Sequence, residues 1–165
     1  DPLNRDYMGR ADFVAKLENT LKAKDLNPSD YRAIVFAGGH GTMWDFAEDE
    51  NLKELATKIY ENNGVVSAIC HGPAALLNLK ISNGDYLIKG KKLAGFSNAE
   101  EEAAGLTKVM PFLLEDELKS RGAFYTKSDI WKKHVVVDGR LITGQNPASA
   151  QAVGEAVAAA LKELR

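Results

Sequence analysis

The sequence predicts a single α/β domain built around a mainly parallel sheet. Two short apolar runs, Ala33–Ala37 and Val65–Ile69, are typical of strands in a sheet that is covered on both faces. Between them, the segment Asp49–Asn63 repeats leucine, alanine and isoleucine on one helical face and closes at Gly64. A strand, a helix and a second strand at this spacing form a βαβ unit, whose strands run parallel with a right-handed crossover.

Local patterns predict the other elements in turn. Near the start, apolar residues at near-helical spacing predict an amphipathic helix that includes Phe13, Leu17, Leu21 and Leu26. The segment Val135–Thr143 has two alternating strands around Asp138-Gly139, a residue pair that favours a hairpin turn. We further expect a helix opening near Pro73, two short strands within residues 86–96, brief helices over residues 98–104 and 112–121, and an alanine-rich helix over residues 148–165.

The composition excludes several classes of protein. The 165 residues are 45% hydrophobic and 27% charged and include one cysteine, which excludes a disulfide scaffold and a disordered chain. A net charge of -2 leaves no basic stripe for nucleic acid. No apolar run approaches the roughly 20 residues of a membrane span, and the first residues lack the apolar core of a signal peptide. We therefore expect one domain over residues 1–165, in the cytoplasm, with neither nucleic acid nor membrane as a partner.

Cys70 is the main candidate for a reactive residue. It follows the second apolar strand directly and precedes His71-Gly72-Pro73. A strand that turns sharply into a helix needs small residues two positions before and after the turn, and Ala68 and Gly72 stand there, as in a nucleophile elbow. Such a turn presents its side chain above a helix N-terminus, where we expect the pKa of the thiol to be lowered toward neutrality. The alternative is a buried cysteine that only fills the core.

A glycine-rich loop, Gly38-Gly39-His40-Gly41-Thr42, leaves the end of the first apolar strand. Because parallel sheets gather their sites at the carboxyl ends of their strands, this loop and Cys70 should lie side by side. Glycines there let backbone N–H groups approach a substrate oxygen, as an oxyanion hole requires. The alternatives are a flexible turn and a phosphate cradle, although both nucleotide fingerprints fail because the loop fits neither G-x-G-x-x-G nor a closing Lys-Ser/Thr pair.

Other polar residues are ambiguous from the sequence alone. His71 could orient or protonate a reacting group, but neighbouring side chains at a sharp turn point apart, so a hydrogen bond to Cys70 is not required. Glu100-Glu101-Glu102 stands at an expected helix start, where acidic residues are usually solvated and only one of the three can face a site. Asn146 falls at another carboxyl strand end. No metal site is expected, since no His or Cys pair has ligand spacing within one element.

Four segments follow one another in the order of a known family: Ala37–Thr42, Gly64–Ala74, Gly95–Ser97 with Glu101, and Asp138–Ala150. Together they resemble the PfpI superfamily, the class I glutamine amidotransferase-like group that includes the Parkinson-associated deglycase. Within it, the chain looks most like the heat-shock-chaperone branch of glutathione-independent glyoxalases, glyoxalase III. The resemblance implies a flavodoxin-like three-layer sandwich, a homodimer and an enzyme without a cofactor.

The resemblance also implies an activity, the conversion of methylglyoxal, a small 2-oxoaldehyde, to lactate by a lyase of the D-lactate dehydratase class. In that chemistry Cys70 adds to the aldehyde, His71 and Glu101 help to move the proton, and the N–H groups of Gly39 and His71 hold the oxyanion. The candidate oxyanion and substrate-binding residues are Gly38, Gly39, His40, Gly41 and Asn146. Deglycase activity on early glycation adducts would use the same cysteine.

Two alternatives to a glyoxalase or deglycase remain at this point. A stress-response holdase chaperone would use an apolar surface and would not need Cys70. A cysteine peptidase or amidohydrolase could be built on the same elbow. Turnover of methylglyoxal without glutathione separates the first function from the other two.

One departure from the family concerns the start of the chain. Family members begin with a strand, a helix and a second strand, and the first of these elements supplies a glutamate beside the cysteine, whereas this sequence starts at Asp1-Pro2. We therefore expect a domain that is N-terminally incomplete relative to the family and lacks its N-terminal βαβ unit. Either the sequence is a fragment or processed piece of a longer protein, or a separate N-terminal segment completes the fold. We expect these residues alone to aggregate or dimerise through an open sheet edge and to turn over methylglyoxal poorly.

Overall fold

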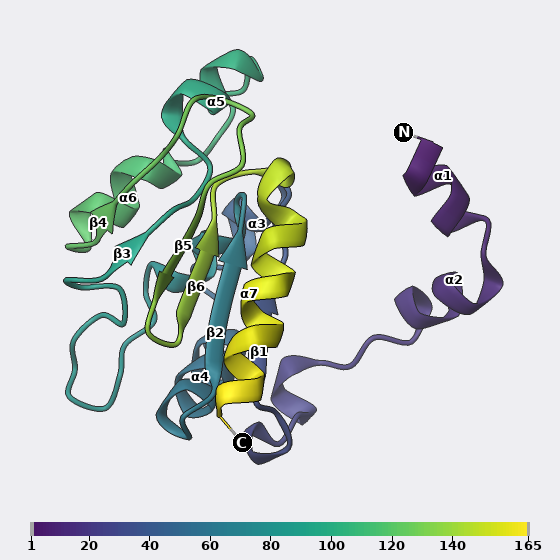
Figure 1. The fold of residues 1–165 in the computed structure, drawn as a ribbon, viewed down its shortest axis with the longest axis vertical. Coiled ribbons are helices and arrows are strands. Elements are labelled where there is room, and N and C mark those ends of the chain that lie inside the picture. The colour runs from purple at the N-terminus through teal and green to yellow at the C-terminus, as the bar shows by residue number, and fades with distance from the viewer. Residues whose placement is uncertain (1, 165) are drawn as a thin grey trace.

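The computed structural model describes residues 2–164. Its centre is a four-stranded sheet, in the order β1 (Ala33–Phe36), β2 (Val65–Ile69), β6 (Leu141–Gly144) and β5 (Val135–Asp138) (Figure 1). Strands β1, β2 and β6 are parallel, and β5 runs antiparallel to β6. The predicted α/β fold with a mainly parallel sheet is therefore confirmed.

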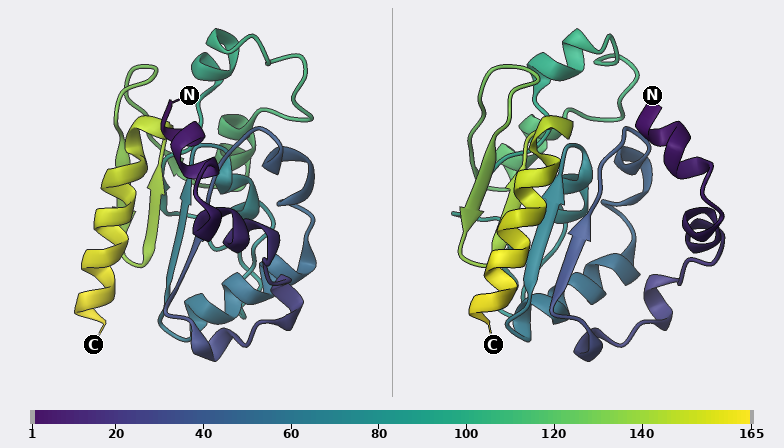
Figure 2. Two further views of the ribbon diagram at one scale, coloured as in Figure 1. Left: turned by 90° about the vertical axis from the view of Figure 1, so that its right-hand side faces the viewer. Right: turned by 45° about the vertical axis from the view of Figure 1, so that its right-hand side comes forward.

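Helices cover both faces of this sheet (Figures 1 and 2). On one face, α7 (Ala150–Glu163) packs against Val65 and Ile142 of the central strands. On the other face lie α4 (Glu50–Glu61) and a 3₁₀ helix at Gly72–Leu76. Because successive residues of a strand point to opposite faces, β2 contributes to both hydrophobic clusters and is the most enclosed strand of the sheet.

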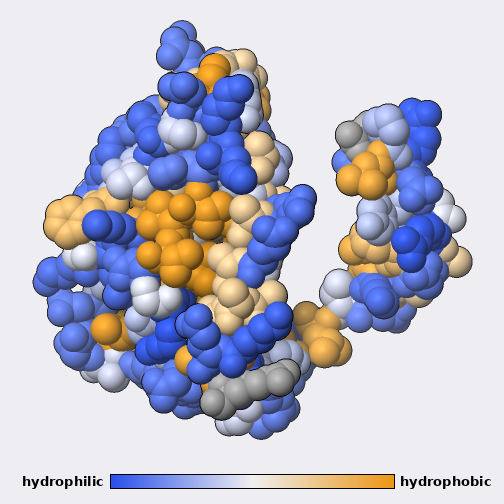
Figure 3. All heavy atoms as spheres, viewed as in Figure 1, coloured by the Kyte–Doolittle hydropathy of each residue, from blue (hydrophilic) through white to orange (hydrophobic). Residues whose placement is uncertain are grey.

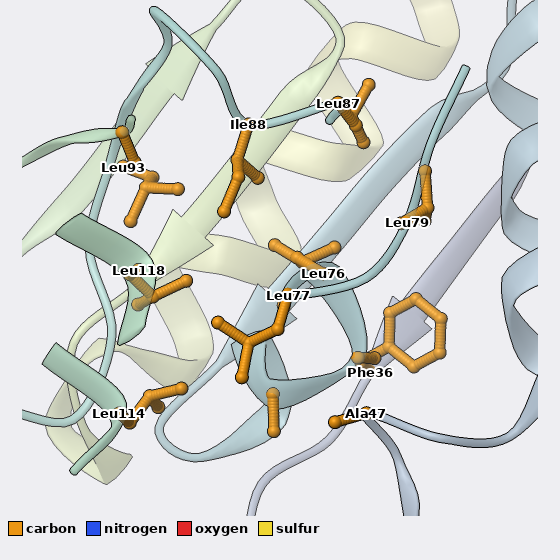
Figure 4. Close-up of a cluster of buried hydrophobic side chains, with 14 of the residues drawn as sticks. Phe36, Ala47, Leu76, Leu77, Leu79, Leu87, Ile88, Leu93, Leu114 and Leu118 are labelled. Carbon is orange, nitrogen blue, oxygen red and sulfur yellow. The ribbon is translucent and has the colours of Figure 1, made fainter. Parts of the chain in front are cut away.

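A smaller unit completes the core beyond β5. It contains a two-stranded parallel sheet of β3 (Lys92–Leu93) and β4 (Phe124–Tyr125), together with α5 (Asn98–Ala103) and α6 (Leu114–Ser120). Figure 4 shows how leucines from these segments and from the chain around the 3₁₀ helix meet in one cluster, which contains Leu76, Leu77, Leu93, Leu114 and Leu118. This packing holds the start of α5 close to the carboxyl end of β2.

Several local predictions are confirmed. The hairpin of β5 and β6 turns at Gly139, whose φ of +58° is the left-handed conformation that the Asp-Gly pair favours. Asp49 caps the N-terminus of helix α4, because its carboxylate accepts the N–H groups of Asn51 and Leu52. Helices α5, α6 and α7 lie where brief and alanine-rich helices are predicted.

Other local predictions are wrong, because distant segments decide the structure there. Residues 86–96 do not form two strands, since only β3 is a strand and its partner is the remote β4. The first amphipathic pattern continues to Leu26, but α2 (Ala11–Glu18) ends before Leu21, which is 73% exposed. A single turn of helix, α3 (Thr42–Asp45), begins at the last residue of the glycine-rich loop, and the helix after Cys70 is 3₁₀ rather than α.

Strand β1 forms an edge of the described sheet. The sequence predicts that this strand is covered on both faces, and this prediction is wrong. Val35 is 52% exposed, and an open apolar groove of about 730 Å³ lies between β1, α4 and residues 20–31. Helix α1 (Pro2–Met8) and α2 contain no buried residue and lie apart from the sheet (Figure 2). Figure 3 shows further hydrophobic side chains at the surface beside α7. Among residues 2–164, no helix is long and apolar enough to cross a membrane.

Candidate active site

Cys70 occupies a strained turn at the carboxyl end of β2. Its φ is +60°, a left-handed conformation that is uncommon for a residue with a side chain. The turn is crowded on both sides, because a Cβ on Gly72 would lie 2.1 Å from the Phe36 carbonyl oxygen and a Cβ on Gly38 would lie 2.6 Å from the Cβ of Cys70. Glycine is therefore required at both positions, and the predicted elbow is present.

His71 joins the cysteine to a carboxylate. Its Nδ1 lies 3.4 Å from Cys70 Sγ, and its Nε2 lies 2.8 Å from Glu101 Oε2. His71 is fully buried and Glu101 is 3% exposed, so water does not compete for these contacts. Because an ionised carboxylate only accepts hydrogen bonds, Nε2 carries the imidazole proton and Nδ1 is left to accept the S–H proton. The sequence does not require a contact between His71 and Cys70, and the structure makes one.

Of the three glutamates at the start of α5, Glu101 alone contacts His71. Glu102 is exposed. Glu100 is fully buried, and its carboxylate accepts hydrogen bonds from Ser97, the Trp131 N–H and the Asn146 amide. Burial by itself would raise the pKa of Glu100, but these hydrogen bonds outweigh it and hold the pKa below its ordinary value. Glu100 is thus a structural anchor for the loop that carries Trp131.

The thiol of Cys70 does not have the lowered pKa that the elbow predicts. Burial raises its pKa to about 11, and the charges of Glu100 and Glu101 add to this, although the N–H groups of His71 and Gly39 act in the opposite direction. The following helix is one short 3₁₀ segment, whose dipole is too small to offset burial. Burial also lowers the pKa of His71, and this effect outweighs the hydrogen bond to Glu101, which by itself would raise the pKa. A neutral thiol beside a neutral imidazole base is the resting state at pH 7.

This state sets the reactivity of the thiol toward alkylating agents. We expect iodoacetamide to label Cys70 at pH 7 roughly 10- to 100-fold more slowly than it labels glutathione, because a raised pKa leaves little thiolate. The rate should rise as pH approaches the thiol pKa of about 11. Mass spectrometry can follow this reaction without ambiguity, since Cys70 is the only cysteine. The protein unfolded in urea is the control and should react like glutathione, and native labelling as fast as this control would contradict the expectation.

Two backbone N–H groups converge on the sulfur of Cys70, from Gly39 and from His71. Among residues 2–164, no backbone carbonyl accepts a hydrogen bond from either group, so both can donate to a substrate oxygen that binds beside the sulfur. Gly39 reaches this position with a φ of +120°, which favours glycine. The Thr42 hydroxyl bonds the carbonyl oxygens of both Gly39 and His71 and so ties the glycine-rich loop to the elbow. The arrangement has the geometry of an oxyanion hole.

The other candidate residues have different surroundings. Gly38 packs against the elbow and Gly41 precedes α3, and neither has a side chain to offer. Asn146 is fully buried, and its amide donates to Glu100 and to the Lys132 carbonyl, so it supports the anchor instead of facing Cys70. His40 lies in the site, with Nε2 3.0 Å from Glu101 Oε1.

A set of metal-ligand atoms occurs here that sequence spacing does not indicate. The ligand atoms of His40, His71 and Glu101 all lie within 4.8 Å of one another, and imidazole and carboxylate are ligands that zinc accepts. In this structure the carboxylate accepts a hydrogen bond from each imidazole instead, which the two N···O distances of 3.0 and 2.8 Å support.

Aromatic side chains back the site, and of these sequence reasoning missed Phe96. The Phe96 ring lies 4.2 Å from the His71 ring, centre to centre, and 5.6 Å from the Trp131 ring. Trp131 has a φ of +61°, and Glu100 holds its N–H. The pattern Ser97-x-x-Glu100 is that of a capping box, which could have identified Glu100 as a structural residue. No local pattern pairs Phe96 with His71.

Comparisons with known proteins agree with this geometry. The model of the DJ-1/PfpI family matches residues 4–160. The chain is 39% identical over 158 residues to Glyoxalase 3 of Candida albicans and 36% identical over 158 residues to Glutathione-independent glyoxalase HSP31 of Saccharomyces cerevisiae. Each alignment covers 92% of this chain and 67% of the relative, so the chain spans about two thirds of either relative's length. The solved structure of Rapid Encystment Protein 24 kDa from Francisella tularensis superimposes with a TM-score of 0.92 at 44% identity, covering 96% of this chain and 70% of that one.

Proposed function

The chain belongs to the DJ-1/PfpI family, and from this premise we propose that the protein is a glutathione-independent glyoxalase that converts methylglyoxal to lactate. The observation that carries the proposal is the contact chain of Cys70 Sγ, His71 and Glu101 beside two backbone N–H groups directed at the sulfur. These groups supply a nucleophile, a base and an oxyanion hole within one site. The names of the two yeast relatives favour the same reaction over the peptidase alternative.

The first step forms a covalent adduct. The sulfur of Cys70 attacks the aldehyde carbon of methylglyoxal while His71 Nδ1 takes the thiol proton. Glu101 stabilises the imidazolium that forms, because it already accepts the Nε2–H. The N–H groups of Gly39 and His71 receive the new oxyanion, which then takes the proton back from His71. The product is a neutral hemithioacetal, and His71 is again a base.

The second step moves hydrogen between the two carbons. His71 removes the proton from the former aldehyde carbon, the resulting enediol is protonated on the neighbouring carbon, and a thioester of lactate forms. One carbon is oxidised and the other reduced within the same molecule, so no external redox partner takes part. Water then cleaves the thioester, which releases lactate and a proton and restores the thiol. Each step uses the base and the oxyanion hole already described.

The partner and location that the sequence implies stay predictions. The homodimer, the separate N-terminal segment and the cytoplasm are not tested by the contacts within one chain. The exposed edge of β1 and the groove beside it form the surface at which a further strand could pair. The molar mass of the purified protein in solution would test the homodimer.

The activity is tested with methylglyoxal in the absence of glutathione, on this domain together with the N-terminal segment that completes the family fold, since poor turnover is expected of residues 1–165 alone. We expect methylglyoxal to disappear and lactate to form in equal amounts. Absence of turnover would contradict the proposal. Suppression of client aggregation that survives Cys70→Ala would then favour a holdase chaperone, and cleavage of peptide or amide substrates would favour a hydrolase.

A further inference from the structure

A second imidazole lies against the carboxylate of Glu101. Oε2 accepts from His71, as described, and Oε1 lies 3.0 Å from His40 Nε2. Each carboxylate oxygen therefore has one imidazole N–H donor. Within the part of the chain that the structure describes, the Glu101 carboxylate contacts these two imidazoles and forms a salt bridge with no lysine or arginine. The orientation of this buried carboxylate depends on both imidazoles.

The chain holds His40 firmly in this position. The Thr42 hydroxyl ties the loop to the elbow, and Gly39 supplies the positive φ that turns the chain before His40. The His40 ring lies 4.2 Å from the His71 ring and 5.8 Å from the Phe96 ring, centre to centre. The His40 side chain is 35% exposed, whereas the His71 side chain is fully buried. His40 is therefore the more exposed of the two histidines that contact Glu101.

We propose that His40 is a positioning residue of the site, and that it acts through Glu101 and does not touch the substrate; this rests on the proposed glyoxalase function. By holding Oε1, His40 keeps Oε2 directed at His71 Nε2. The Nε2–H bond in turn keeps the proton off Nδ1, the atom that faces Cys70. Without a donor on Oε1, the buried carboxylate has an unpaired oxygen and is free to rotate, and His71 loses its fixed tautomer.

Two substitutions of similar chemistry test the proposal. His40→Gln places an amide N–H close to the position of Nε2, so it can still donate to Oε1. His40→Asn has the same amide on a shorter side chain, which ends near the position of Nδ1 and does not reach Oε1. We expect His40→Asn to lower kcat for methylglyoxal about 10- to 100-fold with KM changed less than about threefold, and His40→Gln to stay within about threefold of wild type. The matched control is His134→Gln, since His134 bonds the Thr126 hydroxyl, and its kinetics should equal those of wild type.

A second readout needs no aldehyde. If His71 is the base for Cys70, loss of its fixed tautomer should slow the alkylation of Cys70 by iodoacetamide severalfold in His40→Asn and leave His40→Gln unchanged. This order of rates without any glyoxalase turnover would refute the proposed function and support the role of His40. Glyoxalase turnover without this order of alkylation rates would support the proposed function and refute the role of His40.

Other outcomes overturn the proposal directly. A rise in KM with unchanged kcat would make His40 a substrate contact. Equal losses in His40→Gln and His40→Asn would show that the hydrogen bond to Oε1 is not what His40 contributes. Wild-type kinetics in folded His40→Asn, checked by circular dichroism, would show that Glu101 needs no second donor.

Discussion

Cys70→Ala should lower the turnover of methylglyoxal by at least about 1,000-fold, because no other group in the site can form the covalent adduct. The fold should survive, since alanine keeps the Cβ at the same φ of +60° and leaves the contacts of Gly38 and Gly72 unchanged. The measurements are lactate formation for the activity and thermal unfolding for the stability.

Cys70→Ser serves as a second variant for this result. A hydroxyl is a weaker nucleophile than a thiol, and His71 would have to deprotonate a group of much higher pKa. We expect Cys70→Ser to be nearly as inactive as Cys70→Ala. Turnover within a few-fold of wild type in either variant would exclude a covalent mechanism through this residue.

Single glutamine substitutions in the acidic triplet should have three different outcomes. Glu101→Gln should lower kcat by about 100-fold or more, because an amide cannot accept from both imidazoles and must turn its NH₂ group toward one of them. Glu100→Gln should lower the free energy of unfolding by about 1–3 kcal/mol, because a buried carboxylate with hydrogen bonds from Ser97, Trp131 and Asn146 loses an acceptor. Glu102→Gln is the exposed control and should change neither quantity. Kinetics and urea unfolding of the three variants measure both effects.

The same triplet predicts a pH dependence of stability. The pKa of Glu100 is lowered in the folded protein, so the ionised group favours folding above its ordinary pKa. This contribution should be lost as pH falls from about 4.5 through the lowered value. In Glu100→Gln the loss over this range should be smaller than in wild type. Equal acid sensitivity of the two proteins would show that other carboxylates dominate.

Sequence reasoning predicts the parts of the fold and of the site that depend on neighbouring residues. The Asp138-Gly139 hairpin, the strand before Cys70 and the small residues around the elbow are all local patterns. Only the family resemblance distinguishes Glu101 from its neighbours, since composition is the same for three adjacent glutamates. The structure then shows why only one of them reaches His71, as successive residues of α5 point in different directions.

The rest of the site depends on contacts between segments that are distant in sequence. The raised pKa of Cys70 comes from burial and from two glutamates about 30 residues away, which a helix-terminus argument does not include. His40 and Glu101, which are in contact, lie 61 residues apart in the sequence. The exposure of Val35 depends on what lies beside β1, and the apolar composition of that strand cannot reveal it. Local patterns therefore predict the helices, the strands and the nucleophile, but they do not predict the raised pKa of its thiol.

The contact between Gly72 and Phe36 also limits how this sequence can diverge. A methyl group on Gly72 would lie 2.1 Å from a backbone oxygen of β1, and no change of side chain in β1 can make room for it. A descendant that replaced Gly72 would need a compensating shift in the path of the strand itself, which a single further substitution does not provide. Descendants of this chain are thus expected to change the nucleophile at position 70 more readily than the glycine two residues later, so loss of catalysis should precede loss of the turn.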